Sequence, residues 1–314
     1  MPPVQSHMQG MKSILLGNTG LRVSSLALGT ARLGKSASGV DDAEARRALV
    51  RFAEAGGTLF DSSNAYQSGH AEVLLGDFLR DVGRDAFVIC TKYARPTEAT
   101  SPARRVGSHR GAMRDEVESS LRRLRTDRID LYLVHFDDGV TPMEEILRGL
   151  DDLSRAGKIV HAGLSNFPAW RAATGAAIAD ARGSTPLVAL QMQYNLGERS
   201  IEREHLALAR ARGMTLMAWS PLGGGTVLQH AGLVSIAATY GCDPATVAIA
   251  WLQSKGVLPV LGARTAAHLD ATLAELSLTP EELALLDGTF DRGYPYTLLD
   301  EVRASHGLPL RDVL

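Results

Sequence analysis

The sequence predicts a single α/β domain, a closed (β/α)8 TIM barrel with an N-terminal β-hairpin and a C-terminal tail. Eight short, mostly apolar runs alternate with eight segments of helical periodicity, and no linker or shift in composition interrupts the alternation. The turn after the first run, GTARLG, lacks the glycine fingerprint that a doubly wound sheet carries there. A strict eight-fold alternation therefore favours a closed barrel over an open sheet.

The expected strands are apolar along their whole length and do not alternate between apolar and polar residues. They cover residues 24–29, 58–61, 87–92, 129–135, 159–165, 187–193, 214–219 and 257–262. This pattern is typical of parallel strands that are covered on both faces.

Helical spacing predicts the segments between the strands, and several of their ends carry recognisable signals. The expected helices are residues 41–55, 71–80, 111–125, 142–156, 168–181, 202–212, a longer one at 233–254, and 266–276. Asp41 is an N-cap candidate, and Gly56, Gly157 and Gly213 follow the last turns of three helices, where glycine is favoured.

The two ends of the chain fall outside the alternation. Residues 13–24 predict a hairpin that turns at Asn18-Thr19-Gly20 and covers the barrel floor. Residues 1–10 are interpreted as a tag or disordered leader, which leaves 11–314 as one barrel domain. Residues 290–314 are expected to form a tail or cap.

Composition indicates a globular protein with a small-molecule partner. The 314 residues are 45% hydrophobic with a formal charge of −2, which offers no field for nucleic acid or an anionic membrane. The sequence contains no run of 18 apolar residues, so we expect no membrane span. Cys90 and Cys242 are too few for a disulfide framework or a zinc site, so we expect reduced thiols, a cytoplasmic location and no metal. The sequence carries no signal for an oligomeric state.

Polar residues stand at the end of nearly every expected strand, where barrel enzymes place their reactive groups. They are Asp61 with Tyr66 shortly after it, Thr91-Lys92, His135, Ser165-Asn166, Gln191, Trp219-Ser220 and Gly262-Ala263-Arg264. Asp61 alone is typical of a turn cap, and Lys92 alone indicates little. Together they predict that Asp61 pairs with a buried Lys92, and that Lys92 lowers the pKa of the Tyr66 phenol from about 10. Tyr66 would then serve as a proton donor.

At this point the chain strongly resembles the aldo-keto reductase superfamily. Its ordered segments LGNTGLRVSSLALGT, FDSSNAY, CTKY, DLYLVHFDD, GKIVHAGLSNF, QMQYNL, AWSPLGGG and LGARTAAHLDATL carry the resemblance from about residue 16 to 278. The bacterial and potassium-channel-β-like branches are the most similar. The resemblance implies a catalytic tetrad of Asp61, Tyr66, Lys92 and His135.

The resemblance also implies a nicotinamide coenzyme, with Tyr66 protonating a carbonyl oxygen and His135 orienting that carbonyl. The residues expected to bind the coenzyme are Gly29, Thr30, Asp61, Ser165, Asn166, Gln191, Trp219, Ser220, Pro221, Leu222, Gly223, Gly262, Arg264, Thr265 and His268. Arg264, Thr265 and the start of the helix at Ala266 suit a 2′-phosphate, so NADPH is the expected coenzyme and NADH the alternative.

The chain departs from its relatives after Gly223-Gly224-Gly225, where a longer segment usually covers the cofactor. The expected activity is nevertheless the reversible NADPH-dependent reduction of an aldehyde, ketone or sugar-like carbonyl. One alternative is a cofactor-sensing binding module with slow turnover, as in potassium channel β-subunits. A second, a metal-dependent isomerase or hydrolase, needs more rim ligands than Asp61 and His135. For the substrate pocket we expect contributions from Arg32, Tyr93, Phe136, Phe167 and the tail residues Tyr294 and Tyr296.

Overall fold

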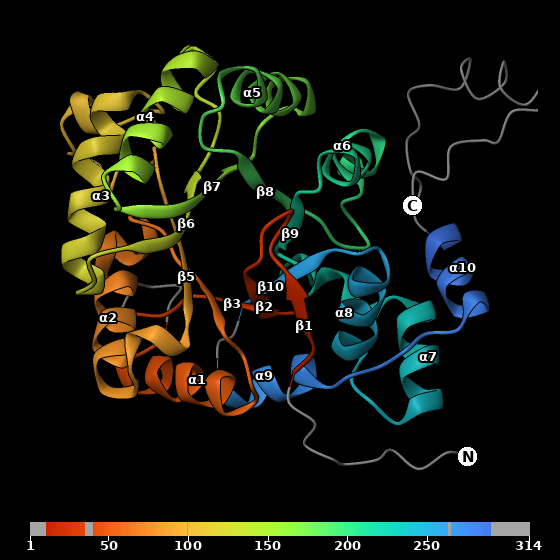
Figure 1. Cartoon of the computed structure of the whole chain (residues 1–314). Helices are drawn as coiled ribbons and strands as arrows, with labels where there is room; N and C mark the ends of the chain where they lie inside the picture. The colour runs from red at the N-terminus through yellow and green to blue at the C-terminus, as the bar shows by residue number, and fades with distance from the viewer. Residues whose placement is uncertain (1–10, 35–39, 99, 263–264, 290–314) are drawn as a thin grey trace, which may run out of the picture.

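The computed structural model describes residues 11–34, 40–98, 100–262 and 265–289, and it confirms the closed barrel. The eight strands pair in the order β10-β3-β4-β5-β6-β7-β8-β9, and helices surround them (Figure 1). The strands are β3 Ala27–Gly29, β4 Leu59–Asp61, β5 Val88–Tyr93, β6 Ile129–Val134, β7 Ile159–Ser165, β8 Leu187–Gln193, β9 Thr215–Trp219 and β10 Leu258–Gly262.

Every neighbouring pair in the barrel is parallel, so the carboxyl ends of all eight strands meet at one rim. The register is what brings the polar residues of the rim together. Asp61 lies opposite Gly29 on one side, and Ser165 lies opposite Gln191. Functional side chains that are far apart in the sequence therefore share this end of the barrel.

The predicted N-terminal hairpin is confirmed, and it closes the opposite end of the barrel. Its strands are β1 Ser13–Leu15 and β2 Arg22–Ser24. Leu16 is fully buried among the side chains that fill the barrel interior. The Gly17 N–H donates to Thr215 Oγ1 at 2.7 Å. A Cβ at Gly17 would come within 2.5 Å of the Val188 carbonyl oxygen, so only glycine fits this close approach.

Helices pack against the outside of the strands and bury the second, larger core. In chain order they are α1 Asp42–Glu54, α2 His70–Val82, α3 Arg110–Leu124, α4 Met143–Arg155, α5 Ala169–Arg182 and α6 His205–Arg212. Asp41 caps α1 as expected, since its side chain accepts from the Glu44 N–H. Between α1, α2 and β4, the Phe60 ring packs edge-on against Phe52 at 5.4 Å and Phe78 at 5.5 Å. Such aromatic contacts fix these helices on the strand that carries Asp61.

The single long helix expected at 233–254 is wrong, because two helices occupy this stretch. α7 Ala231–Tyr240 and α8 Pro244–Ser254 meet at an angle of 101°. Gly241 ends α7 in the left-handed region with φ 64°, and Asp243 caps α8 by accepting from the Ala245 N–H. Pro244 occupies the first turn of α8, where its missing N–H costs nothing. Among the described residues, no single helix has the length and apolarity of a membrane span. Only α7 and α8 taken together reach them, and the pair is sharply bent.

The last described elements are α9 Ala266–Leu273 and α10 Pro280–Thr289, of which α10 was not expected. Asp287 anchors α10 to the barrel by accepting from Trp251 Nε1 at 2.9 Å and from Lys255 Nζ at 2.7 Å. Arg199 Nη1 donates to the Asp287 carbonyl at 3.0 Å. The leader at 1–10 and the tail at 290–314 lie outside the described residues. Cys90 and Cys242 are both free, as expected.

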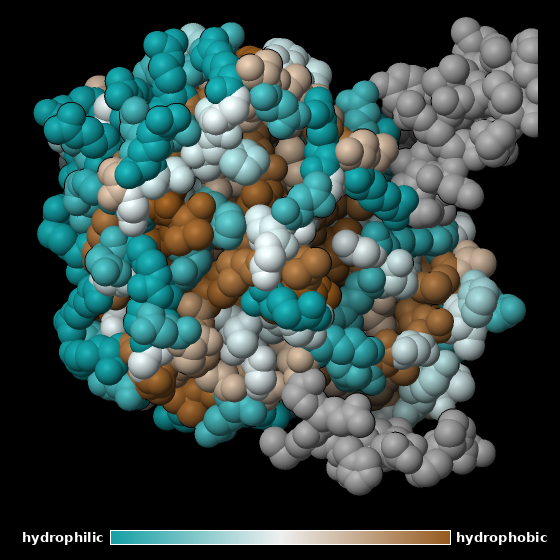
Figure 2. All heavy atoms as spheres, viewed as in Figure 1, coloured by the Kyte–Doolittle hydropathy of each residue, from teal (hydrophilic) through white to brown (hydrophobic). Residues whose placement is uncertain are grey.

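The surface of the barrel-floor face is mixed. Figure 2 shows hydrophilic residues over the outer helices α2, α3 and α4, and hydrophobic residues between elements near the hairpin. A cavity of about 740 Å³ lies on this side of the molecule, lined by residues of the hairpin, of α8 and of the segment after α9.

Candidate active site at the barrel rim

A buried ion pair forms the base of the candidate site. Asp61 ends β4 and Lys92 lies near the end of the adjacent β5, with side chains 2% and 0% exposed. Lys92 Nζ donates to Asp61 Oδ2 at 2.7 Å, to the Ser62 carbonyl at 2.8 Å and to Tyr66 Oη at 3.3 Å. The other Asp61 oxygen accepts from Gln191 Nε2 at 2.8 Å. All three ammonium hydrogens therefore have acceptors, which holds Lys92 in place.

Tyr66 reaches this pair from a tight turn after β4. The turn contains Gln67 and Ser68 in the left-handed region, with φ values of 52° and 54°, and leads into α2. The Tyr66 oxygen accepts from Lys92, so its own hydrogen remains directed elsewhere. The ring of His135, which follows β6, lies edge-on to the Tyr66 ring at 5.8 Å. The structure thus brings together the four residues expected to form the tetrad.

The pKa of Tyr66 differs from our expectation. Burial raises the pKa of the phenol, and the attraction of Lys92 lowers it by less, so the result lies above the ordinary value of 10.0. The sequence predicts the opposite, a pKa lowered by Lys92, and this prediction is wrong. For Lys92 itself, burial is the largest single effect and disfavours the charged form, but the attraction of Asp61, together with Tyr66 and Cys90, exceeds it and raises the pKa. Lys92 is therefore charged and Tyr66 protonated at neutral pH.

His135 is held in the neutral form. Burial, followed by repulsion from Lys92 and Arg95, lowers its pKa from 6.5 to about 2. Its Nδ1 lies 3.0 Å from the hydroxyl of Ser63, a residue in the turn between Asp61 and Tyr66. A neutral imidazole carries one N–H, so the side of the ring that bears the proton decides what it can donate to.

Polar side chains from β7 and β8 continue the rim beside the tetrad. Asn166 donates to the His135 carbonyl at 2.8 Å and to Ser165 Oγ at 3.0 Å, and its oxygen accepts from Trp219 Nε1 at 2.9 Å. These contacts engage the whole Asn166 amide, so it positions its neighbours. The Ser165 hydroxyl and the Gln191 amide lie opposite each other in register and supply the donor and acceptor chemistry that fits a carboxamide.

The remaining rim positions are mostly backbone. Thr30 donates to Ser62 Oγ at 2.8 Å, and a Cβ at Gly29 would lie 3.1 Å from the Leu261 carbonyl oxygen. Ser220 adopts a φ of 54°. The turn that follows contains Pro221, Leu222 and three glycines, Gly223–Gly225. All three glycines have a positive φ. Cβ atoms at Gly224, Gly225 or Gly262 would meet nothing within 4 Å, so these backbone segments border open space.

The start of α9, expected to receive a 2′-phosphate, is partly occupied by the chain itself. The Ala266 N–H donates to Glu44 Oε1 at 2.7 Å, and Thr265 Oγ1 accepts from the His268 N–H at 3.2 Å. The contact with Ala266, followed by the contact with Arg47, lowers the pKa of Glu44, which keeps it anionic. The His268 side chain is on the exposed surface. Arg264 lies outside the described residues.

Sequence reasoning missed several residues that shape the site. Ser63 touches His135, Asn64 Nδ2 donates to Glu116 Oε2 at 2.9 Å, and Glu44 caps α9. Only the FDSSNAY segment signalled the first two, through its run of polar residues directly after a strand. The contacts of Glu116 and Glu44 join separate helices to the site, and local sequence does not encode them.

Two residues expected in the substrate pocket are placed elsewhere. Tyr93 is fully buried, stacks on Tyr132 at 5.3 Å and donates to the Ser108 carbonyl at 2.9 Å. Phe167 is 1% exposed and belongs to the outer core. Phe136 and Arg32 are half-buried, and Tyr294 and Tyr296 lie outside the described residues.

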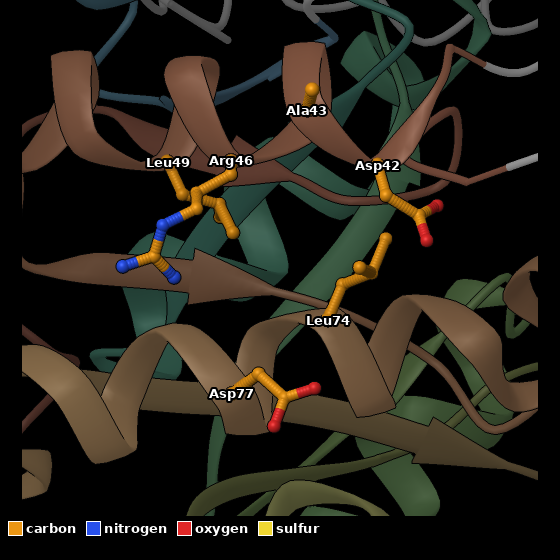
Figure 3. A pocket seen from close by; sticks show the side chains of 6 residues that line it. All are labelled: Asp42, Ala43, Arg46, Leu49, Leu74 and Asp77. Carbon is orange, nitrogen blue, oxygen red and sulfur yellow. The ribbon is translucent and has the colours of Figure 1, made fainter.

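A second depression lies away from the rim. It measures about 300 Å³ and separates α1 from α2. Figure 3 shows Arg46 and Leu49 extending from α1 toward α2, and Leu74 extending the other way. No tetrad residue lines this depression or the floor cavity. In the described part of the chain, no three His, Cys, Asp or Glu residues group as metal ligands.

Comparisons with known proteins agree with the geometry of the rim. A sequence model described as the Aldo/keto reductase family matches residues 25–290. The norsolorinic acid reductase stcV of Emericella nidulans is 33% identical over 336 residues, covering 95% of this chain and 87% of the relative. An aryl-alcohol dehydrogenase of Phanerodontia chrysosporium, whose name specifies NADP(+), is 32% identical over 334 residues, covering 90% of this chain and 87% of the relative.

Proposed function

Because this chain belongs to the aldo/keto reductase family, we propose that it is an NADPH-dependent reductase of aryl aldehydes or ketones that uses Tyr66 as its proton donor. The family and its reductase and dehydrogenase relatives make the chain an oxidoreductase that acts on carbonyl groups. The observation that carries the proposal is the contact at 3.3 Å between Tyr66 Oη and Lys92 Nζ, which is itself paired with Asp61.

In this proposal the Tyr66 phenol gives its proton to the carbonyl oxygen. When bound, the nicotinamide coenzyme supplies the hydride for the carbonyl carbon. The phenol is protonated at neutral pH, because its ordinary pKa is 10.0 and burial raises it further. Once the proton leaves, the phenolate lies beside the charged Lys92, which stabilises it. Asp61 keeps Lys92 charged, and Gln191 holds the second Asp61 oxygen in place.

His135 contributes as a neutral donor. Its pKa of about 2 keeps the ring uncharged in the working pH range. A neutral N–H directed at the carbonyl oxygen polarises the carbonyl without adding a positive charge next to Lys92. Ser165 and Gln191 are the rim side chains proposed to hold the nicotinamide carboxamide, and Trp219 the one proposed to face its ring.

Two observations support an aryl substrate, and a third supports NADPH. The names of the relatives specify an aryl alcohol and norsolorinic acid as their substrates. On this chain the half-buried Phe136, Trp219 and Leu222 offer apolar surface beside the rim. The NADP(+) in the name of one relative supports NADPH, with Arg264 as the proposed partner of the 2′-phosphate. We keep a cytoplasmic location as part of the proposal.

The test is coenzyme oxidation with a panel of carbonyl compounds, followed at the nicotinamide absorbance. We expect turnover of benzaldehyde and aryl ketones with NADPH at kcat/KM values at least tenfold above those for glucose or with NADH. Faster turnover of sugars than of aryl carbonyl compounds would contradict the proposed aryl substrate but not the assignment as a reductase. Tight NADPH binding without turnover of any carbonyl would indicate the alternative, a coenzyme-sensing module.

A further inference from the structure

Ser63 makes a contact with the candidate site that the tetrad alone does not account for. It lies in the turn between Asp61 and Tyr66, is fully buried, and places its hydroxyl 3.0 Å from His135 Nδ1. The His135 backbone is held on both sides, since its N–H donates to the Tyr93 carbonyl at 3.1 Å and its carbonyl accepts from Asn166 at 2.8 Å. The ring of His135 therefore has one defined nitrogen facing Ser63.

The neighbours of Ser63 determine which way its hydroxyl points. Asn64 Nδ2 donates to Glu116 Oε2 at 2.9 Å and to the Arg95 carbonyl at 3.0 Å, which uses both amide hydrogens. This turns the Asn64 oxygen toward Ser63, at 3.3 Å. The Ala65 N–H donates to Ser63 Oγ, also at 3.3 Å. Ser63 thus receives one hydrogen and has two acceptors for its own, the Asn64 oxygen and His135 Nδ1.

Distance favours His135 as the acceptor. An O–H···O hydrogen bond normally measures about 2.5–3.0 Å, so the 3.3 Å separation from the Asn64 oxygen is long for one. The 3.0 Å separation from His135 Nδ1 lies in the ordinary range. A ring that accepts at Nδ1 and is uncharged must carry its proton on Nε2.

We propose that Ser63 is a positioning residue that holds His135 as the Nε2–H tautomer, so that the N–H faces the substrate carbonyl oxygen. This inference rests on the proposed function for its catalytic meaning. With the proton on Nδ1, the Nε2 lone pair would face the carbonyl oxygen and repel it. The buried contacts from Glu116 through Asn64 to Ser63 thereby reach the reaction through the ring of His135.

The first test is nitrogen NMR of the coenzyme-free full chain labelled with ¹⁵N in its histidine rings. The His135 resonances are assigned by their loss in His135→Gln. We expect one-bond coupling to hydrogen at Nε2 and none at Nδ1. We also expect the Nδ1 resonance to move in Ser63→Ala, because an accepted hydrogen bond is lost. A proton on Nδ1 in the wild type, or an Nδ1 resonance that Ser63→Ala leaves in place, would overturn the proposal.

The second test separates positioning from coenzyme binding. Ser63→Ala should lower kcat for benzaldehyde reduction by about tenfold, the effect of one misdirected hydrogen bond, with KM for NADPH unchanged. Ser120→Ala is the matched control, because Ser120 is also fully buried but contacts Arg123 on α3. It should keep the wild-type kcat and the wild-type His135 resonances. A wild-type kcat in Ser63→Ala would contradict the proposal.

The two tests also distinguish this inference from the proposed function. A wild-type protein that reduces no carbonyl compound would remove the proposed function. The NMR experiment would still decide whether Ser63 holds the ring of His135, since it needs neither coenzyme nor substrate.

Discussion

At the scale of single residues, burial and neighbouring charges shift the pKa values of the candidate site in opposite directions. Which effect is larger differs from one side chain to the next. Lys92 is fully buried yet stays charged, because Asp61 lies 2.7 Å away. The Tyr66 hydroxyl oxygen lies 3.3 Å from the Lys92 ammonium, yet burial raises the pKa of the phenol. For Lys92 the combined attraction of Asp61, Tyr66 and Cys90 exceeds the effect of burial, whereas for Tyr66 the attraction of Lys92 does not.

His135 gives a prediction about stability. Its pKa falls from 6.5 to about 2 on folding, so between these values the unfolded chain binds a proton that the folded chain does not. The free energy of unfolding should then decrease as pH falls below 6.5, by about 1.4 kcal/mol per pH unit. His135→Gln lacks this contribution. The stability difference between wild type and variant should shrink by roughly 2 kcal/mol between pH 7 and pH 5.

Urea unfolding at both pH values measures that difference. The pKa values of His161 and His205 are also lowered by burial, but both residues remain in the two proteins and cancel. His268→Gln, which changes an exposed side chain, serves as the control and should follow the wild type. Parallel stability curves for wild type and His135→Gln would show that His135 titrates normally in the folded protein.

Sequence alone predicted which residue types meet at the rim, because parallel strands bring their carboxyl ends together. It predicted the wrong sign for the shift in the pKa of Tyr66, because that sign depends on the burial of the phenol. Nor did it predict the contact between Ser63 and His135. That contact joins residues 72 positions apart in the sequence, and it depends on where the turn after β4 meets the end of β6 in the folded barrel.

At the scale of elements, the contact between α1 and α9 bears on coenzyme choice. The Glu44 carboxylate takes the first amide of α9, where we propose that the 2′-phosphate binds. Two negative charges would then share one helix start.

Glu44→Gln should therefore strengthen NADPH binding by about fivefold and leave NADH binding nearly unchanged, as expected for a repulsion of about 1 kcal/mol near a surface. Fluorescence titration gives both dissociation constants. Glu54→Gln makes the same change of charge at the other end of α1, roughly 15 Å away, and should alter neither. The gain from Glu44→Gln should also shrink as salt is added. Equal effects on NADPH and NADH would place the 2′-phosphate elsewhere.

Most strands and helices were predictable, because each one carries its own apolar run or helical period in its local sequence. The break between α7 and α8 was also signalled, by Gly241, Asp243 and Pro244, but continuous apolar periodicity across it favoured one helix. α10 was not expected, because it follows the eighth repeat. Its anchoring by Asp287 depends on Trp251 and Lys255, which are more than 30 positions away in the sequence.

At the scale of the whole molecule, the barrel separates stability from chemistry. The hairpin and the apolar interior close one end, and the polar rim occupies the other. The two buried charges at the base of the rim, Asp61 and Lys92, are paired with each other, so neither is an isolated charge. The relatives share this family while their names specify different substrates. We attribute that variety to loops such as the short turn after β9, which vary more freely than the scaffold.

The central claim is that Tyr66 protonates a carbonyl as hydride arrives, and its most direct measurement is deuterium transfer. Benzaldehyde is incubated with NADPH deuterated at the transferring position, and mass spectrometry follows the deuterated benzyl alcohol. We predict transfer by the wild type and a rate at least 100-fold lower for Tyr66→Phe, the low end of what a general acid contributes. The dissociation constant for NADPH should stay within about twofold, since the phenol acts in proton transfer and not in coenzyme binding. Transfer by Tyr66→Phe at more than a tenth of the wild-type rate would contradict the account.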